Sequence, residues 1–159
     1  MPLEPADVLR RALLEAGGDE RVACSVAPDL PLLAGDGAAL SGALANVIRN
    51  ALEASPDAAV KVRVRSRDGG RHVEFSVTDF GPGIALSDQP RVFDAGFSRK
   101  PEGSGLGLAV ARATVLGHGG RLRLASAPGG PTTVTIELPA RHRWSAPGEE
   151  SHGRSSVAG

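Results

Sequence analysis

The sequence has one cysteine, one tryptophan and no tyrosine among its 159 residues. A single cysteine excludes a disulfide framework and a cysteine-based metal site. Lysine plus arginine total 18 and aspartate plus glutamate also total 18, so no charge excess favours nucleic acid as a partner. No apolar run is long enough to span a bilayer, and the N-terminus lacks a signal-peptide pattern. We therefore expect a cytoplasmic chain, or a soluble piece of a larger one, without nucleic-acid or direct membrane contact.

Aromatic side chains are also scarce, since only four phenylalanines accompany the tryptophan. The core must therefore be built from leucine, valine, isoleucine and alanine. Cys24 falls in an alternating segment, and we expect it to be a small core residue. Glycine, in contrast, is abundant at 21 residues, and much of it lies in 81–107 and 117–130. This clustering indicates a local, conformational role for glycine.

Hydrophobic periodicity predicts helices and strands along most of the chain. The helices are expected at 6–16, 37–54 and 106–116, and the strands at 21–26, 60–64, 73–77, 121–126 and 133–138. Asp36 is the expected N-cap of the second helix. This order predicts an α/β (α+β) two-layer sandwich, in which one mixed sheet carries about three helices on one face.

A single domain is expected over residues 5–139, after a short N-terminal extension at 1–4. Beyond Pro139 the composition loses almost all apolar residues, so residues 140–159 are expected to form a disordered tail. Residues 80–103 are irregular and rich in glycine, proline and charge. Long irregular segments in compact domains are often lids or binding loops, and we expect a flexible lid here.

The residues around Asp79 suggest a site for a flat ring. Asp79 ends a predicted strand, and Gly81 and Gly83 follow directly. A carboxylate there can accept a hydrogen bond from an exocyclic amine such as the adenine N6 group, and glycines allow close approach of the backbone. Asp-x-Gly-x-Gly also occurs in plain turns, so this motif alone favours a turn.

The second glycine cluster, Gly103-Ser104-Gly105-Leu106-Gly107-Leu108, resembles a phosphate loop that leads into a helix. Backbone N–H groups from Ser104 to Gly107 can converge on phosphate oxygens, and the helix dipole favours an anion. The cluster follows a lid rather than a strand and lacks a Gly-Lys-Ser/Thr sequence, so it is neither a dinucleotide fingerprint nor a Walker A loop. Lys100 is expected to contact the γ-phosphate, whereas Arg99 is expected to be solvated.

Asn46 and Asn50 lie one turn apart on the second predicted helix and therefore share a face. Asparagine has a poor helix propensity, so two of them beside an apolar stripe indicate a function. Their carboxamide oxygens suit Mg²⁺, a hard cation that binds through oxygen. The four histidines form no cluster, and we expect structural or solvated roles for them.

Taken together, these motifs resemble the catalytic ATP-binding domain of bacterial histidine kinases. That domain has the Bergerat fold of the gyrase, heat-shock chaperone, histidine kinase and MutL superfamily. Residues 40–54 resemble the N box, 77–84 the G1 box, 92–100 the F box and 103–108 the G2 box. The resemblance extends over residues 5–139, and the ordered set of boxes makes it specific.

The resemblance implies ATP and Mg²⁺ as ligands and assigns the residues of their site. Asp79 would bind the adenine amine, helped by Thr132 through a water. Asn50 would hold Mg²⁺, Asn46 would support the phosphates, and Lys100 would complete the catalytic set. Further nucleotide contacts would come from the G1, F and G2 boxes: Gly81, Gly83, Ile84, Phe93, Phe97, Gly103, Ser104, Gly105, Leu106, Gly107 and Leu108. The two phenylalanines would anchor the lid.

Several positions depart from the family pattern. ATP hydrolases of the superfamily have a water-activating glutamate where this chain has Asn46, which favours transfer to a protein acceptor over hydrolysis. Glu53 stands where many histidine kinases have a lysine, and Pro131 stands where a glycine usually precedes the threonine. No histidine here lies in a His-Glu or His-Asp pair. The resemblance therefore implies a phospho-acceptor histidine on a separate dimerisation domain, a response regulator downstream, and a monomer in isolation.

Two other functions stay open on the sequence. One is a stand-alone protein-serine kinase resembling the anti-sigma factors of the same superfamily, which are short single domains. The other is a nucleotide-dependent interaction module without transfer activity, because intact binding boxes do not prove turnover.

Overall fold

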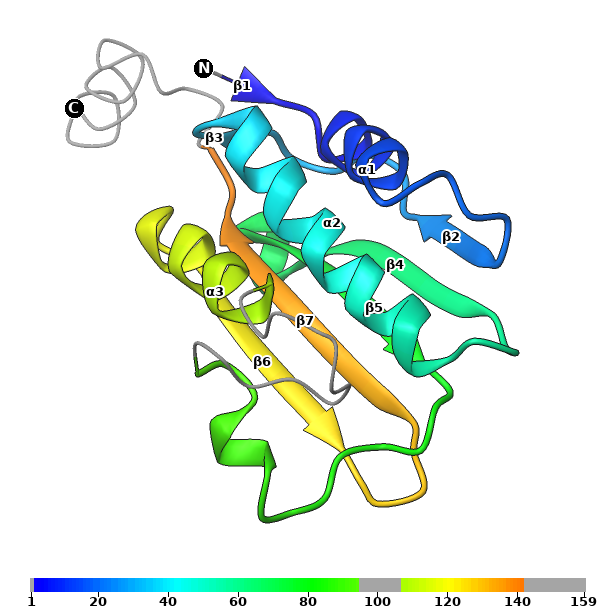
Figure 1. Cartoon of the computed structure of the whole chain (residues 1–159). Coiled ribbons are helices and arrows are strands. Elements are labelled where there is room, and N and C mark those ends of the chain that lie inside the picture. Colours follow the sequence, from blue (N-terminus) through cyan, green and yellow to red (C-terminus); the bar gives the residue numbers. More distant parts are fainter. Residues whose placement is uncertain (1, 95–106, 142–159) are drawn as a thin grey trace, which may run out of the picture.

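The computed structural model describes residues 2–94 and 107–141. Its helices are α1 (Pro5–Glu15), α2 (Gly37–Ala54) and α3 (Gly107–Gly117), with 3-10 turns η1 (Asp68–Gly70) and η2 (Gln89–Arg91). Its strands are β1 (Pro2–Leu3), β2 (Val22–Val26), β3 (Leu33–Ala34), β4 (Val60–Arg67), β5 (His72–Asp79), β6 (Arg121–Ser126) and β7 (Thr132–Pro139). The three helices lie together on one face of the main sheet (Figure 1). The predicted two-layer α/β sandwich is confirmed.

The main sheet has the strand order β2-β4-β5-β7-β6. β2 pairs with β4 in parallel, and every other neighbouring pair in this sheet is antiparallel, so the sheet is mixed as expected. A second, two-stranded sheet joins β1 to β3 and was not predicted. The chain passes from β7 to Ala140, whose N–H donates to the carbonyl of Arg71 at 2.8 Å. From residue 142 on, the expected tail lies outside the described residues.

The core lies between the sheet and α2. Alternate residues of the central strands, such as Val62, Phe75 and Ile136, are buried on the helix side. Full burial of one such side chain stabilises the fold by about 1.5–3 kcal/mol. α2 is the central helix, since it packs against both α1 and α3. No helix in the two described ranges is long and apolar enough to cross a membrane.

The start of α2 is fixed by two residues. Asp36 is its N-cap, as predicted, and the Asp36 carboxylate accepts from the N–H of Ala39 at 3.1 Å. The N–H of Asp36 donates to Nε2 of His118 at 3.1 Å, and Nδ1 of that ring lies 2.8 Å from the carbonyl of Thr114. The imidazole therefore carries its proton on Nδ1. His118 has the structural role expected of it and joins the end of α3 to the start of α2.

Cys24 is exposed, so the expectation that it belongs to the core is wrong. β2 is an edge strand, and four of its five residues are exposed. Alternation in the sequence identifies a strand but does not show whether another element covers it. Partial burial still raises the pKa of the Cys24 thiol above its usual value.

Candidate nucleotide site

Asp79 is the last residue of β5, and its side chain is almost completely buried, with 2% exposed. Register pairs Asp79 with Thr132 of β7 and pairs Thr132 with Ser126 of β6. Thr132 Oγ1 and Ser126 Oγ are 2.6 Å apart. The structure thus brings together the two residues predicted to hold the adenine amine, at one end of the sheet.

The turn after Asp79 is docked against the end of α2. Asp79 Oδ1 accepts from the N–H of Gly81 at 3.0 Å, which orients the carboxylate. The N–H of Phe80 donates to Ser55 Oγ at 3.2 Å. A Cβ at Gly81 would overlap the backbone carbonyl of Ala54, so only glycine fits there.

Gly83 and Ile84 are held by the turn between β6 and β7. Gly83 has φ of +78°, and a Cβ there would overlap the carbonyl of Ala127. Ile84 is buried, and its N–H donates to Ser126 Oγ at 3.0 Å. Close packing within the protein therefore already requires glycine at 81 and 83. Contact of these residues with a nucleotide stays a prediction.

One face of α2 connects the parts of the site. Asn46, Asn50 and Ala54 follow one another at intervals of four residues, so they share a face of α2, and both asparagines are half-buried. Gly107, the first residue of α3, lies beside Asn46, since a Cβ there would be 3.8 Å from Asn46 Cβ. At the other end Ala54 meets Gly81. The asparagine face therefore extends from the N-terminus of α3 to the Asp79 turn.

Arg49 is a residue of this region that sequence reasoning missed. Its Nη2 donates to the carboxamide oxygen of Asn46, and its Nη1 donates to the carbonyl of Glu15 at 2.9 Å. The bond uses one of the two acceptor positions of the Asn46 oxygen and leaves both amide N–H groups as donors. The three-residue spacing from Asn46 to Arg49 on a helix was the signal that could have identified it.

The predicted site also includes residues between 95 and 106. Six predicted residues lie outside the described residues: Phe97, Lys100, Gly103, Ser104, Gly105 and Leu106. Phe93 is half-buried and packs against the core, and Leu108 is buried on α3. The lid beyond residue 94, its phosphate contacts and its lysine therefore stay predictions.

The described groups suit a purine nucleoside triphosphate. A buried carboxylate lies at one end, and a helix N-terminus, which favours anions, lies at the other. Two carboxamides lie between them on α2. Such an arrangement can recognise a base by its amine and hold phosphates at the far end.

Comparison with known proteins also indicates a nucleotide-binding domain. A profile of the family described as "Histidine kinase-, DNA gyrase B-, and HSP90-like ATPase" matches residues 35–142. The chain belongs to this family. Within it, the chain is an ATP-binding catalytic domain of the histidine kinase type.

Individual relatives support this assignment. The sensor-like histidine kinase SenX3 of Mycobacterium tuberculosis is 42% identical over 120 residues, which are 72% of this chain and 29% of that protein. The sensor histidine kinase ZraS of Escherichia coli is 39% identical over 110 residues, 69% of this chain and 23% of that protein. The solved structure of the mycobacterial sensor histidine kinase MprB superposes with a TM-score of 0.76 at 33% identity, covering 89% of this chain and 99% of that one. The chain thus spans less than a third of the length of these two curated relatives.

Proposed function

We propose that this domain transfers the γ-phosphoryl group of Mg²⁺-ATP to a histidine on a separate dimerisation domain, from which a response regulator receives it. The observation that carries the proposal is the face of α2 that runs from Gly107, past Asn46 and Asn50, to the Asp79 turn. Relatives named as sensor histidine kinases support the choice of acceptor.

The residues suit phosphoryl transfer by positioning. Such transfer needs little covalent chemistry from the protein and depends on alignment and on neutralising charge. Asp79 would fix the adenine, while the N–H groups at the start of α3 and the amide of Asn46 would hold phosphate oxygens. A carboxamide cannot take a proton from water, so Asn46 supplies no general base for hydrolysis.

Asn50 is the proposed protein ligand of Mg²⁺. No group of three or more His, Cys, Asp or Glu side chains within residues 2–94 and 107–141 could hold a metal ion. A cation here would therefore depend on the Asn50 carboxamide together with phosphate and water oxygens, which is a usual environment for Mg²⁺. The metal would neutralise charge on the phosphates.

The direct test combines this domain with a histidine-bearing helical hairpin from a sensor kinase and with γ-labelled ATP. Label on the hairpin that is lost in acid and retained in alkali is the expected result, because phosphohistidine is acid-labile. Acid-stable label on a serine would favour the anti-sigma-type kinase instead. Tight ATP binding by calorimetry with no label on any acceptor would favour the interaction module.

A further inference from the structure

The side of the main sheet opposite the helices, which we call the open face, carries mostly charged and polar residues. In β4 the residues that alternate with buried Val60, Val62 and Val64 are all basic. Register places the outward residues of β5, β7 and β6 beside them. The charged residues of the open face are Lys61, Arg63, Arg65, Arg67, Glu74, Arg121, Arg123 and Glu137.

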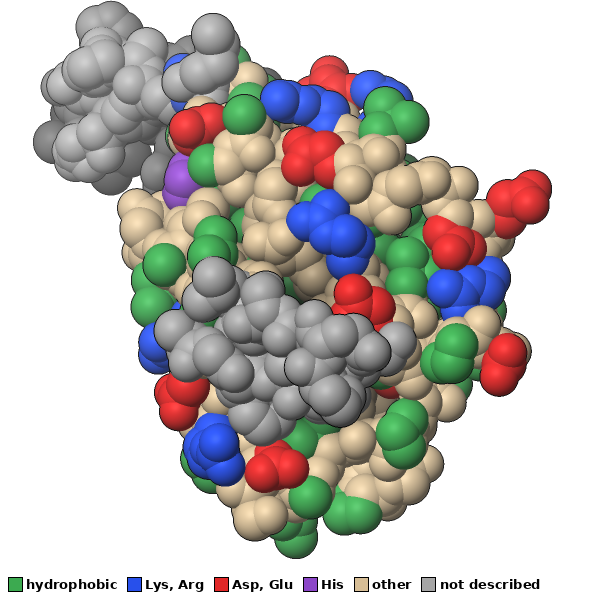
Figure 2. All heavy atoms as spheres, viewed as in Figure 1, with side chains coloured by type: hydrophobic (Ala, Val, Ile, Leu, Met, Phe, Trp, Pro, Cys, Tyr) green, Lys and Arg blue, Asp and Glu red, His purple; other side chains and the backbone are tan. Residues whose placement is uncertain are grey.

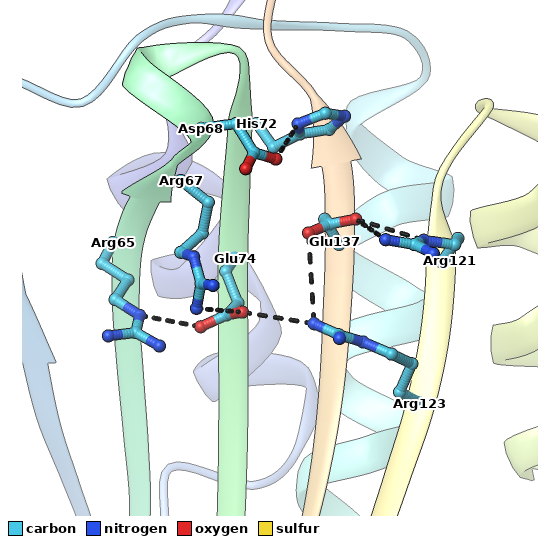
Figure 3. Close-up of polar contacts among 8 residues, drawn as sticks. All are labelled: Arg65, Arg67, Asp68, His72, Glu74, Arg121, Arg123 and Glu137. Atoms are coloured by element: carbon cyan, nitrogen blue, oxygen red, sulfur yellow. Dashed lines mark hydrogen bonds and ion pairs between the residues drawn. The ribbon is translucent and has the colours of Figure 1, made fainter.

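Two buried carboxylates hold four of these arginines in place (Figure 3). Glu74, whose side chain is 4% exposed, lies 2.8 Å from Arg65 Nε and 3.4 Å from both Arg67 Nη1 and Arg123 Nη2. Glu137 lies 3.0 Å from Arg121 Nη2 and 4.0 Å from Arg123 Nη2. Each guanidinium has five N–H donors, so most of them stay available after these contacts. The two carboxylates therefore orient these arginines and still leave N–H donors for a partner.

A depression of about 480 Å³ adjoins this array on the same face. Its lining includes the hydroxyls of Ser76, Thr78 and Thr133 together with Lys61 and Arg63. Lys61 Nζ lies 5.5 Å from the centroid of the Phe80 ring, while Arg63 makes no ion pair within the described part of the chain. These hydroxyl groups and two cations are suited to bind a carboxylate group of another molecule.

The charge of the open face differs from that of the chain as a whole. The chain has a net charge of zero. The open face has six cations against Glu74 and Glu137, and Asp68 at its end adds a third carboxylate that contacts His72. Three positive charges therefore remain with histidine neutral. The helix side, in contrast, shows acidic and basic side chains interspersed (Figure 2).

We propose that the open face is a docking surface for an acidic patch on a partner protein, with Lys61 and Arg63 as its main contacts. Charge complementarity selects an anionic partner. Glu74 and Glu137 interrupt the row of cations, whereas a nucleic-acid backbone is usually matched by a continuous basic stripe. The strands of this face carry no aromatic residue on their outward side, and Phe80, beside Lys61, is a single exposed ring. One ring makes neither a platform for stacking successive bases nor an apolar surface for insertion into a membrane.

Poly-L-glutamate serves as the probe for the test. Amide chemical shifts of the labelled domain would be followed during titration in 0.15 M NaCl, without nucleotide. We expect the largest shift changes in β4 and its neighbours β2 and β5, smaller ones in β7 and β6, and roughly fivefold weaker binding for the double variant Lys61→Gln/Arg63→Gln. The matched control, Arg10→Gln/Arg11→Gln on α1, removes the same charge from the helix side and should bind as the parent does.

Three outcomes would overturn the proposal: no binding at this salt concentration, an equal loss in the control variant, or tighter binding of an RNA oligonucleotide or phosphatidylserine vesicles than of poly-L-glutamate. Both double variants change only exposed residues, and their retained shift dispersion would show that they fold. Because the titration contains no ATP, its failure would leave the proposed kinase function untouched.

Discussion

Arg49 holds Asn46 by its carboxamide oxygen and holds the end of α1 by the carbonyl of Glu15. Arg49→Met should release the Asn46 side chain and lower the rate of phosphoryl transfer by roughly tenfold, because the amide would no longer be fixed toward the phosphates. ATP affinity should change by less than about twofold, since ground-state binding rests on other groups.

The assay is labelling of the added hairpin at varied ATP concentration, which separates kcat from KM. Arg49→Lys should recover part of the rate, and Arg71→Met, at an exposed turn position, is the control. Equal loss of rate and affinity would show that Arg49 acts on binding or folding and not on Asn46.

Asp79→Asn should weaken ATP binding by about 1.5–3 kcal/mol, because it replaces the charged acceptor of the adenine amine. Calorimetry with ATP and with the triphosphate of purine riboside, which lacks the amine, makes the test specific. The parent should prefer ATP, and the variant should lose most of that preference. Asp57→Asn, at an exposed position after α2, should bind like the parent. Unchanged affinity in folded Asp79→Asn would remove the adenine assignment.

Asn50→Ala should weaken nucleotide binding more in the presence of Mg²⁺ than in EDTA, because the carboxamide oxygen is the proposed metal ligand. Calorimetric titrations with and without the metal measure the difference. The exposed Glu53→Ala variant, one turn further along α2, controls for changes in the helix itself. Equal losses in both conditions would argue against a metal role for Asn50.

Glu74→Gln should destabilise the fold by about 2–4 kcal/mol, because three arginines would lose the buried carboxylate between them. Arg67→Gln should cost less than about 1 kcal/mol, since its side chain is 43% exposed. Urea denaturation of both variants gives the comparison. Similar losses for the two would mean that Glu74 is not the centre of the array.

Cys24 should react slowly with iodoacetamide at neutral pH despite its exposure. Burial raises the pKa of its thiol, so less thiolate is present at a given pH than in a simple cysteine peptide. The rate should therefore rise with pH later than the peptide's rate does. A pH–rate profile that coincides with the peptide's profile would contradict this. Cys24→Ser provides the unlabelled control.

Much of the fold could be predicted because its main elements are long and periodic. The apolar stripe of α2 and the alternation of apolar and polar residues in β4 and β5 correctly predicted one helix and two strands. Asp36 was also correctly predicted as the N-cap of α2. β1 and β3 have two residues each, which is too short for any period to show. The exposure of Cys24 was missed because strand order is a tertiary property.

Site residues could be predicted where they belong to a sequence motif. They were harder to predict where their role depends on contacts that form only in the folded protein. Register confirmed that Asp79 and Thr132 are neighbours. The glycines at 81 and 83 were explained by ligand approach, whereas the structure shows close contact with Ala54 and Ala127. The burial of Glu74 on a charged face gave no sequence signal, because glutamate between apolar residues reads as an ordinary outward position of a strand.

The His118 contact sets the length of α3. The helix begins beside Asn46 and is tied at its far end to Asp36, and both points belong to the same stretch of α2. Eleven residues make a rod of about 16 Å, close to the distance that ten residues of α2 cover. Adding or removing one residue would turn the imidazole by about 100° and carry it away from Asp36. The buried residues Leu108, Ala111 and Val115 thus limit the composition of this helix, while the contacts at its two ends limit its residue count.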